Sequence, residues 1–216
     1  MINAADFKNS MKNINKKTIF IIIFSIIFII LLILIKTNHI YDFDIFIYNL
    51  FAMHINDNLT SFFKLMTSLG EGISIAIYCI AILVLSFILK KRNFGLAIAG
   101  SVAFNSIFSE VLKMIIQRPR PEILQLAEES SYSFPSSHTV ASVSLCGILI
   151  YFILRSGLDK NMKMILIILL VLFPLLIGIS RIYLGVHNAS DVLGGAILAM
   201  ILLLIEISII EKKELF

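Results

Sequence analysis

Six long stretches of this sequence carry almost no charge, and they restrict the fold more than any other feature. They are Ile19–Ile35, Gly72–Leu89, Asn93–Ser109, His138–Leu154, Met164–Ser180 and Val192–Ile205. A helix needs about 20 residues to cross a hydrocarbon core of ~30 Å, and each stretch reaches that length with a few flanking residues. The stretches are continuous rather than alternating, and no water reaches the bilayer core to pair with the backbone. Membrane-spanning helices, not barrel strands, are therefore predicted.

The composition supports this interpretation. Of 216 residues, 59% are hydrophobic and 15% are charged, and the mean hydropathy is +0.97. Soluble domains contain about 45–50% apolar and about 25% charged residues, so a soluble enzyme or a nucleic-acid-binding module is excluded despite the net charge of +4. No repeat or linker divides the chain. We expect one all-α, polytopic membrane domain of six transmembrane helices over residues 1–216.

The first apolar stretch resembles a signal peptide, but the residues after it, Lys36 to Asn38, offer no small-residue cleavage site. We therefore expect an uncleaved first helix. Between the first two spans, the apolar pattern from Ile45 to Phe51 predicts a short helix in the membrane interface. His39 and His54 lie in the same connection and are expected to be solvated or interfacial.

The positive charges predict an orientation. With the N-terminus inside, twelve of the eighteen Lys and Arg residues fall on inner segments: Lys8, Lys12, Lys16, Lys17, Lys90, Lys91, Arg92, Arg155, Lys160, Lys163, Lys212 and Lys213. This excess places both termini in the cytoplasm of a multi-pass plasma-membrane protein. Four of the six outer positives are Lys113, Arg118, Arg120 and Arg181, where the topology rule disfavours them. They therefore need another reason to be there.

Phosphate binding would explain the outer positive charges, because polar residues from four helix ends lie at one membrane depth. Lys113 and Arg120 suit the outer oxygens of a phosphoryl group, and the helix start at Ser136 and Ser137 adds backbone donors. The next two residues of interest, His187 and Asp191, are four apart. A carboxylate can hold the proton of one imidazole nitrogen and leave the other free to attack.

A second histidine, His138, is then available to protonate the leaving oxygen. Each of these features alone is more often a turn, a capped helix start or a solvated pair. It is their order and shared depth that favour a phosphoryl-transfer site. Gly185 and the pair Gly194-Gly195 are expected to serve close helix packing.

This constellation resembles the phosphatidic acid phosphatase type 2 superfamily. The motif K-x6-RP is matched by Lys113 to Pro121, PSGH by Pro135 to His138, and SR-x5-H-x3-D by Ser180 to Asp191. The resemblance implies that His187 is a nucleophile forming a phosphohistidine, with Asp191 orienting it and His138 donating the proton. It also implies that the phosphate is held by a set of five residues: Lys113, Arg120, Ser136, Ser137 and Arg181.

Two positions depart from or lie outside the motifs. Ser137 stands where the family usually has Gly, and we expect no strain if that residue only donates its backbone N–H. Arg118 lies outside the motif and is either a headgroup or loop contact or an ordinary surface residue.

No metal site and no cofactor are expected. The expected partner is a lipid phosphate or diphosphate in the bilayer, bound at the extracytoplasmic face. A phosphotransferase with the same residues and a non-catalytic lipid-phosphate binding or transport protein are the alternatives. The lipid is left open among undecaprenyl diphosphate, phosphatidylglycerophosphate, phosphatidate and a lipid A phosphate, and so is the oligomeric state.

Overall fold

The structure, a computed structural model, describes residues 16–212, which form eight α-helices and no β-strand. The helices are α2 (Lys16–Lys36), α3 (Tyr41–Ala52), α4 (Asp57–Leu69), α5 (Gly72–Ile88), α6 (Arg92–Ile116), α7 (Ser137–Arg155), α8 (Lys160–Tyr183) and α9 (Ala189–Lys212). The all-helical fold is confirmed, and each predicted span lies within a helix or differs from it by one residue at an end.

Five of the helices are long and apolar enough to cross a membrane, and the number is six if the bent pair α4 and α5 is counted as one span. The bend of 48° lies between Leu69 and Gly72. Helix α4 was not predicted, because its sequence mixes polar and apolar residues. It begins after Asn56, whose side chain accepts a hydrogen bond from Leu59 N at 2.9 Å and so caps the helix.

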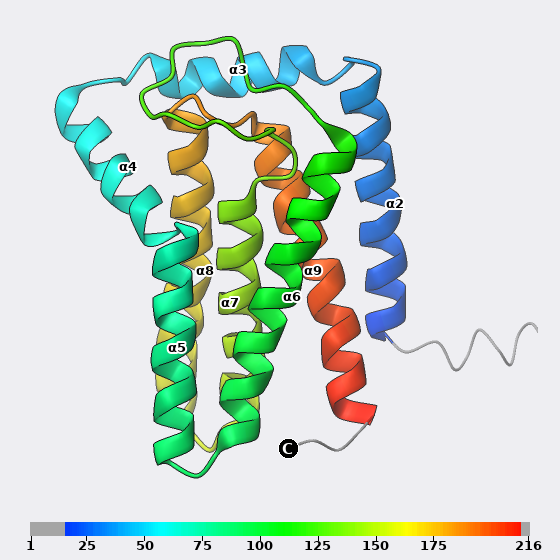
Figure 1. The fold of residues 1–216 in the computed structure, drawn as a ribbon, viewed down its shortest axis with the longest axis vertical. Coiled ribbons are helices and arrows are strands. Elements are labelled where there is room, and N and C mark those ends of the chain that lie inside the picture. The colour runs from blue at the N-terminus through cyan, green and yellow to red at the C-terminus, as the bar shows by residue number, and fades with distance from the viewer. Residues whose placement is uncertain (1–15, 213–216) are drawn as a thin grey trace, which may run out of the picture.

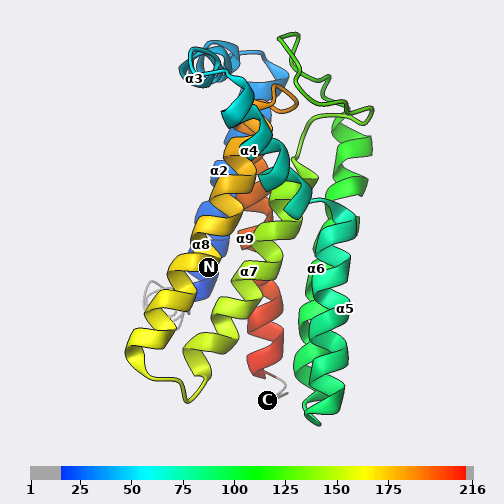
Figure 2. The same cartoon turned by 90° about the vertical axis from the view of Figure 1, so that its left-hand side faces the viewer.

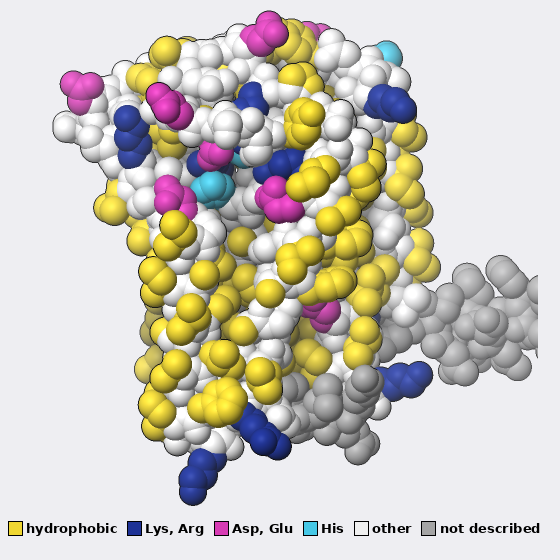
Figure 3. Space-filling model, in the orientation of Figure 1, with side chains coloured by type: hydrophobic (Ala, Val, Ile, Leu, Met, Phe, Trp, Pro, Cys, Tyr) yellow, Lys and Arg dark blue, Asp and Glu magenta, His cyan; other side chains and the backbone are white. Residues whose placement is uncertain are grey.

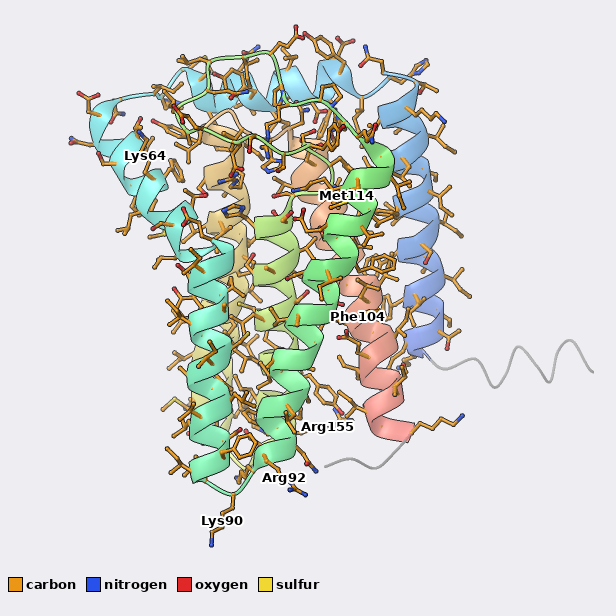
Figure 4. All side chains as sticks on the ribbon, viewed as in Figure 1. Lys64, Lys90, Arg92, Phe104, Met114 and Arg155 are labelled. Atoms are coloured by element: carbon orange, nitrogen blue, oxygen red, sulfur yellow. The ribbon has the colours of Figure 1, made fainter. Side chains whose placement is uncertain are left out.

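The interfacial helix is confirmed as α3, which lies across one end of an upright bundle (Figures 1 and 2). We call this the site end. Helix α7 is central and contacts α5, α6, α8 and α9. The opposite end carries Lys90, Arg92 and Arg155 (Figure 4), and there Glu211 of α9 pairs with both Arg155 and Lys17.

The face of the bundle that Figure 3 shows is mainly apolar between its two ends. Helix α2 contacts mainly α9, and only 6% of its most apolar window is buried. So much exposed hydrocarbon would promote aggregation in water but suits contact with lipid tails. His39 and His54, by contrast, are solvent-exposed as expected.

Two glycines let α9 approach the turn that precedes α7. A Cβ atom on Gly194 would lie 2.3 Å from the ring of Phe134, and one on Gly195 would lie 2.9 Å from the carbonyl oxygen of Ser136. Phe134 is fully buried, and its ring centroid is 5.9 Å from that of Phe28 on α2. The predicted packing role of the glycine pair is confirmed, and it presses the start of α7 against α9 at the site end.

Candidate active site

Lys113 occupies the last turn of α6, beside the start of α7. It is 5% exposed; its Nζ donates to Ser137 Oγ at 2.6 Å and lies 3.5 Å from Glu110 Oε1. Helix α6 ends at Ile116 and is followed by Gln117, whose backbone is left-handed with φ 52°. The backbone of Ser137 is not left-handed, so serine is accommodated there without strain, as expected.

Arg120 and Arg181 share one carboxylate, that of Glu129. Arg181, in the last turn of α8, donates through Nη2 to Glu129 and through Nη1 to Thr67 Oγ1 at 2.8 Å. Arg120, on the connection between α6 and α7, places Nη2 3.4 Å from Glu129 Oε2 and donates through Nε to Ser131 O at 2.7 Å. Because carboxylate and phosphate oxygens bind guanidinium groups in similar ways, Glu129 marks an anion site between the two arginines.

The charge state of Glu129 follows from the same contacts. Burial raises the pKa of its carboxyl, but the charges of Arg181 and Arg120 outweigh burial and hold that pKa below the ordinary value. Glu129 is therefore ionised at neutral pH.

His187 lies in the short connection between α8 and α9 and is 2% exposed. Its Nδ1 is 3.6 Å from Asp191 Oδ2, which is longer than a hydrogen bond, and its Nε2 is 3.4 Å from Arg120 Nη1. Since a guanidinium can only donate, a bond from Arg120 requires a lone pair on Nε2, and the ring proton then faces Asp191.

The pKa of His187 is lowered to about 4. Burial is the largest cause; the Asp191 carboxylate opposes it, and the charges of Arg181 and Arg120 add to it. The imidazole is therefore neutral at pH 7, which is the form that can act as a nucleophile.

His138 is the second residue of α7, and its Nε2 atom is buried without a hydrogen-bond partner. Two further nitrogens of the predicted residues share this property: Arg181 Nε and His187 Nδ1. Buried polar atoms are costly when unpaired. His187 Nδ1 faces Asp191 at 3.6 Å, so His138 Nε2 and Arg181 Nε are the two that a polar ligand could pair with.

Ser136 differs from the other predicted phosphate ligands, because its backbone N–H is already used. That N–H donates to Asp191 O at 3.2 Å, and its hydroxyl accepts from Thr139 Oγ1 at 3.1 Å. Ser136 thus joins the start of α7 to α9, and its backbone amide is not free to bind an anion.

Three contributors to the site were missed by the sequence analysis: Glu129, Thr67 and Asp44. Asp44, on α3, is 2% exposed and accepts from Arg118 Nη2 at 2.8 Å. The surplus of cations at this end was the one available signal, because buried positive charges need acidic partners.

A cavity of about 650 Å³ opens beside these cations, a size typical of ligand pockets. Its lining includes Glu110, Lys113, Arg120, Glu129, Ser131 and Tyr132. Figure 3 shows acidic, basic and histidine side chains gathered near this end, above a mainly apolar face. Within residues 16–212, no three His, Cys, Asp or Glu side chains lie close enough together to hold a metal ion.

Residues 94–215, more than half of the chain, match the family model of the PAP2 superfamily. The chain belongs to the PAP2 superfamily. The resemblance inferred from the three motifs is confirmed, although the role of each motif residue remains a prediction.

Two sequence relatives carry phosphatase names. Phosphatidylglycerophosphatase B of Bacillus subtilis is 37% identical over 132 residues, which cover 60% of this chain and 64% of that protein. Lipid phosphate phosphatase delta of Arabidopsis thaliana is 28% identical over 127 residues, 53% of this chain and 30% of that protein. The chain thus spans less than two thirds of the length of either relative.

Two solved structures are also similar. The crystal structure of a transmembrane PAP2-type phosphatidylglycerolphosphate phosphatase from Bacillus subtilis has a TM-score of 0.82 and 29% identity, covering 89% of this chain and 96% of that one. Aquifex aeolicus LpxE has a TM-score of 0.61 and 25% identity, covering 76% of this chain and 94% of that one. This chain is therefore a multi-pass membrane protein with the fold of PAP2 phosphatases.

Proposed function

We propose that this protein is an integral-membrane lipid phosphatase that hydrolyses a phosphate monoester or diphosphate through a phosphohistidine on His187. The observation that carries the proposal is the pair of histidines beside Lys113, Arg120 and Arg181: a neutral His187 whose Nε2 faces Arg120, and His138 with an unpartnered Nε2. The phosphatase names of the relatives support it.

In the first step, His187 Nε2 attacks phosphorus and the bond to the lipid oxygen breaks. His138, which enters this step as the protonated imidazolium, gives that oxygen a proton, so the lipid leaves as an alcohol or a monophosphate. In the second step, water attacks the phosphohistidine while His138 takes its proton, and inorganic phosphate leaves. Lys113, Arg120 and Arg181 stabilise the charge on the transferring phosphoryl group, and Asp191 stabilises the His187 proton on Nδ1.

We further propose that the site faces the extracytoplasmic side. Of the Lys and Arg residues that the structure describes, nine lie toward the opposite end: Lys16, Lys17, Lys90, Lys91, Arg92, Arg155, Lys160, Lys163 and Lys212. Lys8, Lys12 and Lys213 lie outside the described residues. Six lie toward the site end, and four of those belong to the polar site or adjoin it. An excess of positive charge on the opposite end supports a cytoplasmic position for that end.

A comparison of the two histidines tests the mechanism. We expect His187→Ala to lose turnover and the acid-labile phosphoenzyme with every substrate. His138→Ala should lose about 10²–10⁴-fold on a lipid monophosphate but far less on p-nitrophenyl phosphate, whose leaving group needs little protonation. Rapid quench of purified protein in EDTA measures both, and His54→Ala, an exposed histidine, is the matched control.

Phosphoenzyme in His187→Ala, or equal losses for both histidines on both substrates, would contradict the assigned roles. Product analysis with and without a lipid or sugar acceptor separates hydrolysis from the phosphotransferase alternative. A binding or transport protein would show no turnover with any substrate.

A further inference from the structure

Arg118 fills none of the three motif positions, yet its guanidinium lies at the centre of a buried chain of charges. Nη1 donates to Asp191 Oδ1 at 2.6 Å and to Ser190 Oγ at 2.7 Å, and Nη2 donates to Asp44 Oδ2 at 2.8 Å. The side chains of Arg118, Asp44 and Asp191 are 13%, 1% and 0% exposed. Two carboxylates therefore already match the charge of Arg118, which leaves it no role as a free phosphate ligand.

Asp44 connects this chain to the interfacial helix α3. Its two carboxylate oxygens accept from Ser190 N at 2.8 Å and from Ser190 Oγ at 2.6 Å, in the first turn of α9. A negative charge at a helix N-terminus is favourable, because the first backbone N–H groups there have no partner within the helix. Asp44 thus fastens α3 to the turn of α9 that carries Asp191.

Both oxygens of Asp191 are fixed by neighbours. Oδ1 accepts from Arg118, while Oδ2 accepts from Asn188 N at 2.8 Å and lies 3.6 Å from His187 Nδ1. Without Arg118, Oδ1 would lose its strongest partner, and the carboxylates of Asp44 and Asp191 would share a buried site without a cation between them. Arg118 and the backbone N–H of Asn188 together hold the Asp191 carboxylate in the orientation that faces His187.

We propose that Arg118 and Asp44 are positioning residues for the pair formed by His187 and Asp191, an inference that rests on the proposed function. Arg118 orients the Asp191 carboxylate so that Oδ2 faces the imidazole. Asp44 holds Arg118 and the first turn of α9 in place from α3. The interfacial helix is then part of the catalytic apparatus, although it contributes no group that contacts the phosphate.

The test separates positioning from phosphate binding in the purified full-length protein. Arg118→Gln should lower kcat by roughly 10–100-fold, by analogy with the loss seen when the hydrogen-bond partner of a metal-binding side chain is removed. It should leave the Ki of inorganic phosphate unchanged. Arg120→Gln should instead raise that Ki. Arg155→Gln, which removes an arginine from an ion pair at the opposite end, is the matched control and should keep full kcat.

A double-mutant cycle tests whether Arg118 acts through Asp191. In an Asp191→Asn background, Arg118→Gln should cause almost no further loss of kcat. If the kcat losses of the two single variants multiply in the double variant, or if Arg118→Gln raises the phosphate Ki, the inference is overturned and the proposed function is left intact. Full turnover in His187→Ala would overturn the proposed function itself.

Two milder variants keep the test decisive if Arg118→Gln does not fold. Arg118→Lys keeps the charge but lacks the planar fork that reaches both carboxylates, so it should show a smaller loss of kcat. Asp44→Asn keeps Arg118 and should also lose kcat, with no further loss in the Asp191→Asn background. Wild-type kcat in both folded variants would refute the positioning roles.

Discussion

Glu129 lies where we expect the substrate phosphate to bind, so removing its charge should strengthen phosphate binding. Its carboxylate pairs with Arg181 and lies 3.4 Å from Arg120 Nη2, and its side chain is 25% exposed. A phosphate must displace it to reach both guanidinium groups. A hydrogen bond to a charged group contributes about 1.5–3 kcal/mol, and we take the lower end because water reaches Glu129.

We therefore expect Glu129→Gln to bind phosphate more tightly by about 1.5 kcal/mol, which is roughly a tenfold fall in Ki. The Ki of inorganic phosphate or orthovanadate, measured against turnover of p-nitrophenyl phosphate, gives this value directly. Because Arg181 and Arg120 keep the pKa of Glu129 below its ordinary value although burial raises it, the carboxylate is ionised at neutral pH. The gain should persist at neutral and mildly acidic pH and shrink only when the wild-type carboxylate protonates.

The neighbouring Glu128→Gln is the matched control, since Glu128 is exposed and the same charge is removed from the same loop. It should leave the Ki unchanged. An unchanged or higher Ki in Glu129→Gln would show that Glu129 supports the site rather than competing with the phosphate, and the reasoning would be refuted.

Two further predictions concern orientation and the loop over the site. In intact cells, Ser130→Cys should react with a maleimide that cannot cross the membrane, and Gly157→Cys should not. Cys79 and Cys146 are buried and should give little background labelling. The reverse pattern would place the site on the cytoplasmic side of the membrane. Gly185→Ala should lower stability by about 1–3 kcal/mol in thermal unfolding, because Gly185 has φ +70° and a Cβ there would lie 2.1 Å from Leu124 O. Gly157→Ala, with no atom within 4 Å of its Cβ, is the control, and equal stability of the two variants would contradict this explanation.

The membrane spans could be predicted from the sequence, and so could the position of Lys113, His138 and His187 at the same end of the bundle. Continuous apolar runs fix the number of crossings, and alternating crossings bring the ends of α6 and α8 and the start of α7 to one membrane face. Gly185 was expected to serve helix packing, but it adopts a left-handed turn beneath the loop that carries Leu124. That contact joins segments 61 residues apart, and no local pattern encodes it.

The partners of the cations could not be predicted for a similar reason. Glu129 and Asp44 lie in acidic stretches whose neighbours, Glu128 and Asp42, look equivalent in the sequence. Only the packing of the connection after α6 and of α3 decides which carboxylate is buried against an arginine. Arg118 had two alternative roles at the sequence level, and the structure instead buries it between carboxylates.

The helices that precede residue 94 have a consequence for anyone who would treat the family-matched stretch, 94–215, as a transferable module. Phe28 on α2 packs against Phe134, Asp44 on α3 bonds to Ser190, and Thr67 on α4 accepts a bond from Arg181. A chimera that grafted 94–215 onto the first four helices of a distant relative would keep every motif and would lose each of these three contacts for which those helices carry no matching side chain. Restoring the residues of this chain at positions 28, 44 and 67 should therefore come before any change to the motifs.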